Sequence, residues 1–309
     1  MGGSDIRGAI LALMATLIYY LGFIVFRVSA NRMPELRGTR PLSLIRYTYT
    51  NWLWLSGLVI VLAGVATQVK ALTMLPLSLA QPIFAASLIF VLFYAGVFFG
   101  ERLSGREWAC VGLFGLATAL VGASNGRREV MTSSVAGPMV LFAIVIPGIL
   151  VGVAVLVGGD VRTFGRHARP LAGIAHGIGC GVSLGVSELA LKGVAAVYNA
   201  HGLATALYGS PYPYVAVGMA ALGLAQLQIG LQRCRMSIVV SVLTVTAKTQ
   251  LVILGTVLYK EPWPSDRLLL ALRIGAFVLA GAALVLFPRH EAVEERSGAA
   301  LTSPARERA

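Results

Sequence analysis

The sequence predicts an all-α membrane protein, a polytopic bundle of about nine transmembrane helices built from two inverted repeats. Three observations lead to this fold class. Of the 309 residues, 57% are hydrophobic and only 12% are charged, about half the charged fraction of a soluble domain. Uncharged runs long enough to cross a bilayer recur along the chain. Finally, Gln68–Glu101 is matched by Gln228–Glu261 at a constant offset of 160 residues (228 − 68).

The apolar runs predict the individual spans, because a helix needs about 20 such residues to cross the hydrocarbon core. We expect spans at about 6–27, 51–74, 78–100, 107–124, 135–158, 171–197, 213–233, 236–259 and 267–287. The segment Pro41–Asn51 leaves an alternative open. A separate short helix over Leu42–Thr50 would make ten spans and would place the N-terminus inside.

The arginines predict the orientation of the chain. The connection after the first span carries Arg32, Arg37, Arg40 and Arg46, and cytoplasmic loops have an excess of Lys and Arg. Alternation from there places the N-terminus outside and the C-terminus inside a cytoplasmic (plasma) membrane. Because the net charge of +12 lies mostly in short loops between spans and in the tail, we expect no nucleic-acid partner.

The repeat also divides the chain into parts. Residues 1–124 are predicted to form the first transmembrane repeat, 125–165 a linking helix and loops, and 166–288 the second repeat. Residues 289–309 are too polar to pack and are predicted to form a disordered cytosolic tail. The single linking span turns the second repeat upside down relative to the first. Secondary transporters often have this plan, with the substrate near the membrane midplane between the repeats.

Lys248 is the first candidate site residue, since it lies in the middle of the eighth predicted span. A lysine there costs about 2.5–3.5 kcal/mol on insertion scales and needs a compensating partner. Steps of three and four residues place Ser241 and Thr244 on the same helical face as Lys248. These residues indicate either a cavity that binds an anionic group or a structural ion pair between helices.

Glu188 is the carboxylate expected near this face. It can pair with Lys192, one turn away on the same helix, or it can serve Lys248 or a coupling proton. Gln68 and Gln228 hold matching places in the two repeats. Their amides can line the cavity or hydrogen-bond across helices, and both interpretations stay open. Gln81 is the polar residue on the corresponding face of the first repeat and completes the candidate cavity.

Metal-ion sites, cofactors and enzymatic chemistry are not indicated. No His, Cys, Asp or Glu residues stand at metal-ligand spacing, and no nucleophile or carboxylate pair converges. The cysteines, Cys110, Cys180 and Cys234, lie inside or at the ends of apolar segments and are expected to be packing residues.

A family resemblance rests on a further set of residues. It consists of Gly64, Pro-Leu-Ser-Leu-Ala-Gln-Pro at 76–82, Gly-Glu-Arg-Leu at 100–103, Gly105 and Glu107-Trp108. This pattern resembles the drug/metabolite transporter superfamily, in particular its EamA-like bacterial members and the related NIPA-type magnesium transporter branch. The likeness covers Trp52–Ser124 well and Tyr212–Phe287 more faintly. It implies a helical transporter with a central cavity and alternating access. One departure is Val65, where the NIPA-type pattern has an acidic residue.

The sequence therefore predicts a secondary transporter of a small organic metabolite with an anionic or zwitterionic group near Lys248. The expected partners are that substrate, the lipid bilayer and a coupling proton or ion. Two alternatives are a NIPA-like transporter of magnesium or another divalent cation, and a non-transport membrane scaffold or lipid-handling accessory protein. The oligomeric state is not predicted.

Overall fold

A computed structural model describes residues 3–74, 90–101, 105–124, 138–161, 168–258 and 264–301. These residues form helices joined by short turns and contain no strand. The helices are α1 (Gly3–Arg32), α2 (Pro41–Tyr49), α3 (Trp52–Met74), Phe90–Phe99, α5 (Gly105–Ser124), α6 (Pro138–Val161), α7 (Ala168–His201), α8 (Leu203–Tyr208), α9 (Tyr212–Arg233), α10 (Met236–Leu258) and α11 (Arg267–Leu301).

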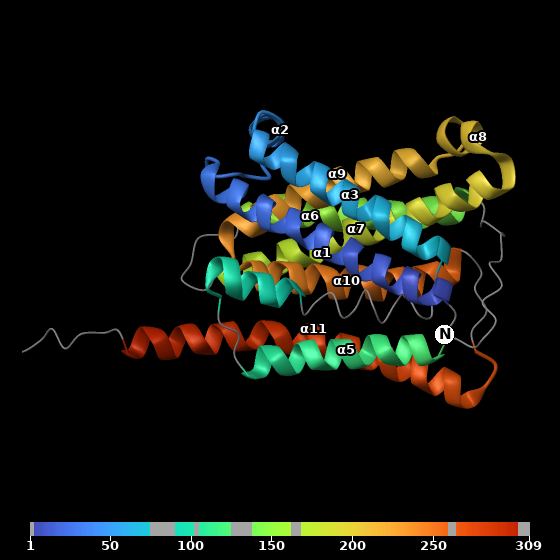
Figure 1. Ribbon diagram of the computed structural model, residues 1–309. Coiled ribbons are helices and arrows are strands. Elements are labelled where there is room, and N and C mark those ends of the chain that lie inside the picture. Colours follow the sequence, from blue (N-terminus) through green and yellow to red (C-terminus); the bar gives the residue numbers. More distant parts are fainter. Residues whose placement is uncertain are drawn as a thin grey trace, which may run out of the picture.

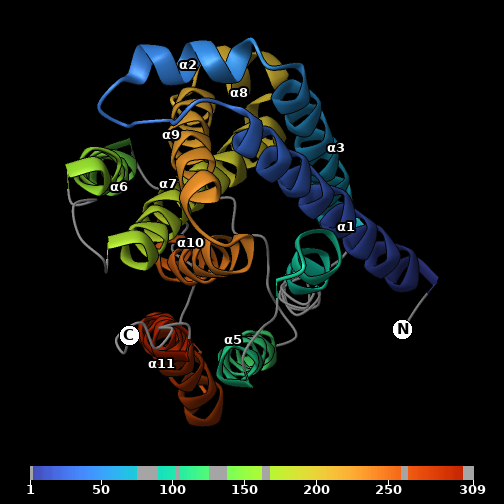
Figure 2. The same cartoon turned by 90° about the vertical axis from the view of Figure 1, so that its left-hand side faces the viewer.

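The long helices run along a common direction and pack in pairs (Figure 1). α1 packs along α3, α7 packs along both α9 and α10, and α5 packs along α11. Seen from one end, the α5–α11 pair lies at the edge of the bundle (Figure 2), where a buried apolar cluster joins it to α7 and α10. The start of α1 and the last turns of α11 lie at opposite ends of the bundle (Figure 1).

Several helices are long and apolar enough to cross a membrane. Five in the described residues meet this criterion, namely Arg7–Arg32, Met139–Gly159, Gly173–Tyr198, Tyr212–Arg233 and Met236–Gly255. A sixth is added if Pro41–Tyr49 and Trp52–Gln68 form one bent span. The protein is thus a multi-pass membrane protein. Predicted spans 78–100 and 135–158 fall partly outside the described residues, and the count of nine or ten stays a prediction.

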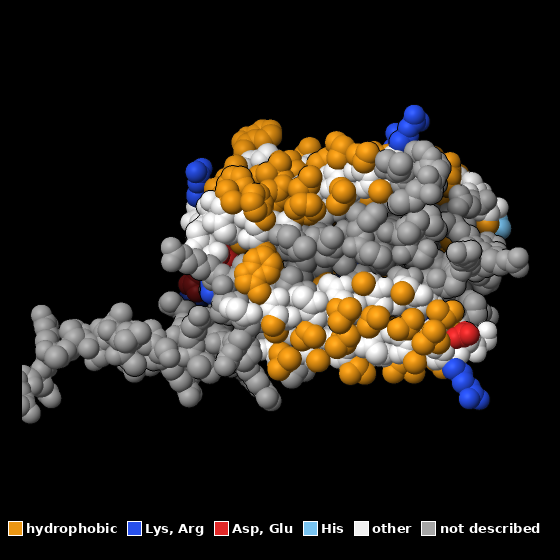
Figure 3. Space-filling model, turned by 60° about the horizontal axis from the view of Figure 1, so that its bottom comes forward, with side chains coloured by type: hydrophobic (Ala, Val, Ile, Leu, Met, Phe, Trp, Pro, Cys, Tyr) orange, Lys and Arg blue, Asp and Glu red, His pale blue; other side chains and the backbone are white. Residues whose placement is uncertain are grey.

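Apolar side chains also cover the outside of the bundle. Hydrophobic residues occupy much of the described surface in Figure 3, and the charged side chains lie at its margins. Large exposed examples are Trp52, Met139 and Val217. A surface of this kind is suited to lipid rather than to water.

The ambiguous segment after the first span forms the separate helix α2, which meets α3 at an angle of 81°. Pro41 is the first residue of α2. Asn51 precedes α3, and its Oδ1 accepts a hydrogen bond from the Trp54 N–H (3.1 Å). Such a side-chain acceptor satisfies a free donor in the first turn of a helix. At nine residues, α2 is about 14 Å long and cannot cross the hydrocarbon core by itself.

The order of helices repeats along the chain with the offset found in the sequence. α3 begins at Trp52 and α9 at Tyr212 (212 − 52 = 160). α8 lies within 201–209, the range that corresponds to α2. α2 and α8 lie at opposite ends of the bundle (Figure 1). Two inverted repeats require this arrangement; the inverted relation itself and the domain boundaries stay predictions.

The predicted C-terminal tail, residues 289–309, lies partly within the described residues, and its disorder stays a prediction. α11 continues through residues 289–301 as a helix, and the remaining eight residues lie outside the described part. Ala, Glu and Arg are frequent in this segment and have high helix propensity, which accounts for the continuation.

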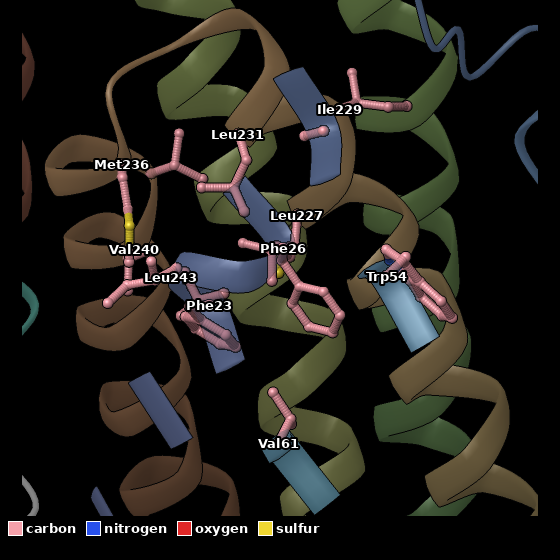
Figure 4. Packing of buried hydrophobic residues seen from close by; sticks show 14 of the residues in the cluster. Phe23, Phe26, Trp54, Val61, Leu227, Ile229, Leu231, Met236, Val240 and Leu243 are labelled. Carbon is pink, nitrogen blue, oxygen red and sulfur yellow. The ribbon is translucent and has the colours of Figure 1, made fainter. Parts of the chain in front are cut away.

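A large apolar cluster joins α1, α3, α9 and α10 near the α2 end of the bundle (Figure 4). We call it the α2-end cluster and define it by Phe23, Phe26, Trp54, Leu227, Leu231, Met236 and Val240, all buried. The rings of Phe26 and Trp54 stack with centroids 5.5 Å apart. Because the cluster combines helices from both predicted repeats, it holds the two halves together at this end.

Gly64 belongs to the family pattern, and the structure gives the reason for a glycine there. At this residue α3 lies close to the backbone of α1. A Cβ at this position would lie 2.8 Å from the backbone nitrogen of Tyr19. Neither helix can yield locally at a backbone atom, so a side chain at residue 64 forces the two helices apart.

We therefore expect Gly64→Ala to destabilise the protein by about 1–3 kcal/mol, the usual cost of overpacking. The measurement is the thermal unfolding midpoint of the purified protein in detergent. Gly112→Ala on α5 is the matched control, since no atom lies within 4 Å of a Cβ at that position, and it should leave the midpoint unchanged or raise it. Equal midpoints for both variants would contradict the close α1–α3 contact.

Candidate functional site

A glycine face on α7 sets the distance between α7 and α10. A Cβ at Gly181 would lie 2.7 Å from the carbonyl oxygen of Leu243, and one at Gly185 would lie 3.3 Å from that of Ala247. Small residues at four-residue spacing allow such close helix packing in membranes. The close packing brings the next turns of the two helices, which carry Glu188 and Lys248, opposite each other.

Glu188 and Lys248 form an ion pair between α7 and α10. The Lys248 ammonium donates to Glu188 Oε2 over 2.7 Å. The Glu188 side chain keeps 32% of its surface exposed and the Lys248 side chain keeps 19%. The pair therefore faces an open space rather than the tightly packed interior. The interhelical partner considered for Glu188 from the sequence, Lys248, is thus in contact with it. Lys192 lies exposed on α7.

The open space beside this pair is a cavity of about 490 Å³, part of it open to the surroundings. α7 and α10 contribute Glu188, Thr244 and Lys248. The opposite wall comes from α1 and α3 and carries Thr16, Tyr19, Tyr20 and Gln68. The Tyr20 hydroxyl and Thr244 Oγ1 lie 3.5 Å apart and link the two walls. One carboxylate, one ammonium and several neutral oxygens thus surround the same space.

The structure brings together four of the predicted site residues, namely Lys248, Thr244, Glu188 and Gln68. Three others lie away from this cavity in the described part of the chain. Ser241 is buried in the α10 interface, and Gln228 donates Nε2 to the carbonyl oxygen of Phe26 over 3.2 Å. Lys192 does not line the cavity, and Gln81 lies outside the described residues.

Sequence reasoning did not identify the α1 wall. Thr16, Tyr19 and Tyr20 are spaced by three or four residues within an apolar segment, and this spacing was the signal that could have found them. Glu101 was also missed. Its carboxylate accepts hydrogen bonds from the backbone N–H groups of Met236 and Ser237 (2.9 and 3.0 Å). It therefore caps the N-terminus of α10, where a negative charge is stabilising.

No group of three or more His, Cys, Asp or Glu side chains within the described ranges is arranged to hold a metal ion. Among the lining residues that the structure describes, a cation that enters the cavity meets the Glu188 carboxylate, the Lys248 ammonium and neutral oxygens.

Comparison with known families now becomes decisive. The family model described as magnesium transporter NIPA matches residues 4–291. The chain belongs to the NIPA magnesium transporter family. The resemblance inferred from the sequence is thus confirmed, and the protein is a membrane transporter rather than an enzyme. Comparison with curated proteins and with solved structures gives no match.

We predict that Glu188 and Lys248 depend on each other for stability. Glu188→Gln leaves an unpaired ammonium, and Lys248→Met leaves an unpaired carboxylate. Breaking a fully buried pair costs about 3–5 kcal/mol, and partial exposure lowers that cost here. Each single variant should therefore unfold at a lower temperature than the double variant Glu188→Gln/Lys248→Met. The measurement is the thermal unfolding midpoint in detergent of the wild-type protein, the two single variants and the double variant. If the two single losses of stability add up in the double variant, the direct contact is contradicted.

Proposed function

We propose that this NIPA-family transporter carries a divalent cation, with magnesium the first candidate, and that Glu188 in the cavity binds it. The observation that carries the proposal is the composition of the cavity. A carboxylate faces the hydroxyls of Thr16, Tyr20 and Thr244 across one open space. The match to a magnesium transporter family supports the same class of substrate.

A single carboxylate is compatible with magnesium because this ion gives up its water reluctantly. Mg²⁺ usually keeps several waters and binds proteins through one or two carboxylates. Neutral hydroxyl and amide oxygens can accept hydrogen bonds from those waters. The absence of an acidic residue at Val65 therefore does not argue against magnesium.

Lys248 then acts as the counter-charge of the empty site. Its ammonium neutralises Glu188 when no cation is present, so the carboxylate is never left unpaired inside the membrane. A bound cation must displace this ammonium. Two unit charges 4 Å apart interact by about 4 kcal/mol at an effective dielectric constant of 20. Repulsion from Lys248 thus weakens cation binding and favours release.

The organic-metabolite hypothesis assigns the opposite role to Lys248, that of the group that binds an anionic substrate. The presence of Lys248 in the cavity is the observation in its favour, but the family match gives it no support. The scaffold alternative treats both charges as structural. The three hypotheses differ in what happens when either charge is removed.

The test is magnesium flux into proteoliposomes that contain an internal magnesium-sensitive dye. We expect Glu188→Gln to reduce flux at least tenfold, because it removes the carboxylate. Lys248→Met should lower the apparent KM for Mg²⁺ by about tenfold and reduce the maximal rate, because the cation binds without competition and leaves slowly. Glu188→Asp should restore part of the flux.

Lys70→Met is the matched control. Lys70 is an exposed lysine on α3 that does not line the cavity, and its replacement should leave KM and rate unchanged. Normal magnesium flux through Glu188→Gln would overturn the proposal. Loss of substrate binding in Lys248→Met alone would favour the organic anion, and full tolerance of the double variant would favour the scaffold.

A further inference from the structure

The two ends of the bundle differ in a way that the repeated helix order does not explain. The cavity lies beside the middle of α1 and α10. Between it and the α2 end lies the α2-end cluster (Figure 4). Beyond the cluster, Gln232 Nε2 donates to the carbonyl oxygens of Ala30, Met33 and Pro34 at 3.0–3.2 Å. Polar and apolar contacts together close this end.

Gln228 is the polar residue inside that closed region. Its side chain is 1% exposed, and its Nε2 donates to the Phe26 carbonyl oxygen over 3.2 Å. Its Oε1 accepts no hydrogen bond within the described part of the chain. A buried amide with an unsatisfied acceptor is costly, and hydration of the same group in another conformation would account for its presence.

The offset between the repeats connects this region to the cavity. Adding 160 to the cavity residues Thr16, Tyr20 and Gln68 gives 176, 180 and 228. These positions hold His176, Cys180 and Gln228, whose side chains are 0%, 0% and 1% exposed. A second wall with the same register, containing an imidazole, a thiol and an amide, is thus buried in this structure.

We propose that His176, Cys180 and Gln228 line a second cavity, which opens to the α2 end when the transporter faces the opposite side of the membrane. The inference rests on the proposed function for the identity of the substrate. It rests on the predicted inverted repeat for the positions of these residues. In that state α9 separates from α1, and the Gln228–Phe26 hydrogen bond is broken. Neutral polar groups then contact the hydrated cation as it leaves Glu188.

The same register assigns a matching role to Gln68. Phe26 corresponds to residue 186 (26 + 160), which is Val186 on α7. Gln68 lines the present cavity together with Leu184 and Glu188, which flank Val186. Closure of the cavity would bring Gln68 Nε2 to the Val186 carbonyl oxygen. Gln228 and Gln68 would therefore stabilise opposite states, each by one hydrogen bond.

Cys180 provides a native reporter for the second cavity. The chain has three cysteines, so Cys110→Ala/Cys234→Ala leaves Cys180 alone. The experiment measures its reaction with a membrane-impermeant methanethiosulfonate reagent added to one side of proteoliposomes. Thr50→Cys, exposed at the end of α2, identifies the α2 side in a chain without the native cysteines.

We expect Cys180 to react from the α2 side. Gln228→Leu should raise the rate about two- to tenfold, the range for loss of one hydrogen bond, and Gln68→Leu should lower it by a similar factor. Cys110 is the matched control, measured in the variant Cys180→Ala/Cys234→Ala. It is buried in a separate cluster between α5, α10 and α11, and its rate should not respond to Gln228→Leu.

Three results would overturn the inference. The first is that Cys180 in folded protein does not react from the α2 side, although Thr50→Cys does. The second is that Cys180 reacts from the α8 side only. The third is that both glutamine variants change the rate in the same direction. Folding is checked by the unfolding midpoint of each variant. The labelling uses no magnesium, so a failed flux experiment with normal labelling would reject the substrate and leave the second cavity standing.

Discussion

The close contact between α7 and α10 is the constraint on which the site depends. Without a side chain at Gly181 and Gly185, the α7 backbone can approach the carbonyl oxygens of α10. Only at that distance can the short Glu188 side chain reach Lys248 within 2.7 Å. The pair makes a lysine in the middle of the membrane tolerable, because each charge replaces the water that the other has lost. Wider packing would leave both charges uncompensated.

Under the proposed function, this arrangement also explains why a site for a cation can contain a cation of its own. A bare carboxylate in a membrane cavity would either bind its substrate too tightly or become neutral. The tethered ammonium is always present at high local concentration, so it occupies Glu188 between transport cycles. Binding of the substrate becomes an exchange rather than a simple addition. The neutral oxygens of the α1 wall contact the water shell without adding charge.

The sequence predicted the class and the repeated order of the helices, because apolar runs and a constant offset are visible in one dimension. It also predicted four residues of the cavity, since buried charges and amides are rare in membrane segments. It did not predict the α1 wall, because Thr16 and Tyr20 can also face neighbouring helices. The contact between Glu188 and Lys248 depends on the α7–α10 distance, which no local pattern contains. The substrate depended on the family match.

The ion pair has no counterpart in the predicted first repeat, although the order of the helices repeats along the chain. Glu188 and Lys248 correspond to Val28 and Leu88 in the first repeat (188 − 160 and 248 − 160), so the first repeat carries no ion pair at the matching place. Both charges lie on helices of the second repeat that pack tightly together. Movement of α1 and α3 against this unit changes which side reaches Glu188 but need not separate the pair. In the proposed mechanism, therefore, the binding group Glu188 stays fixed while the walls around it move, because only the predicted second repeat carries the charges.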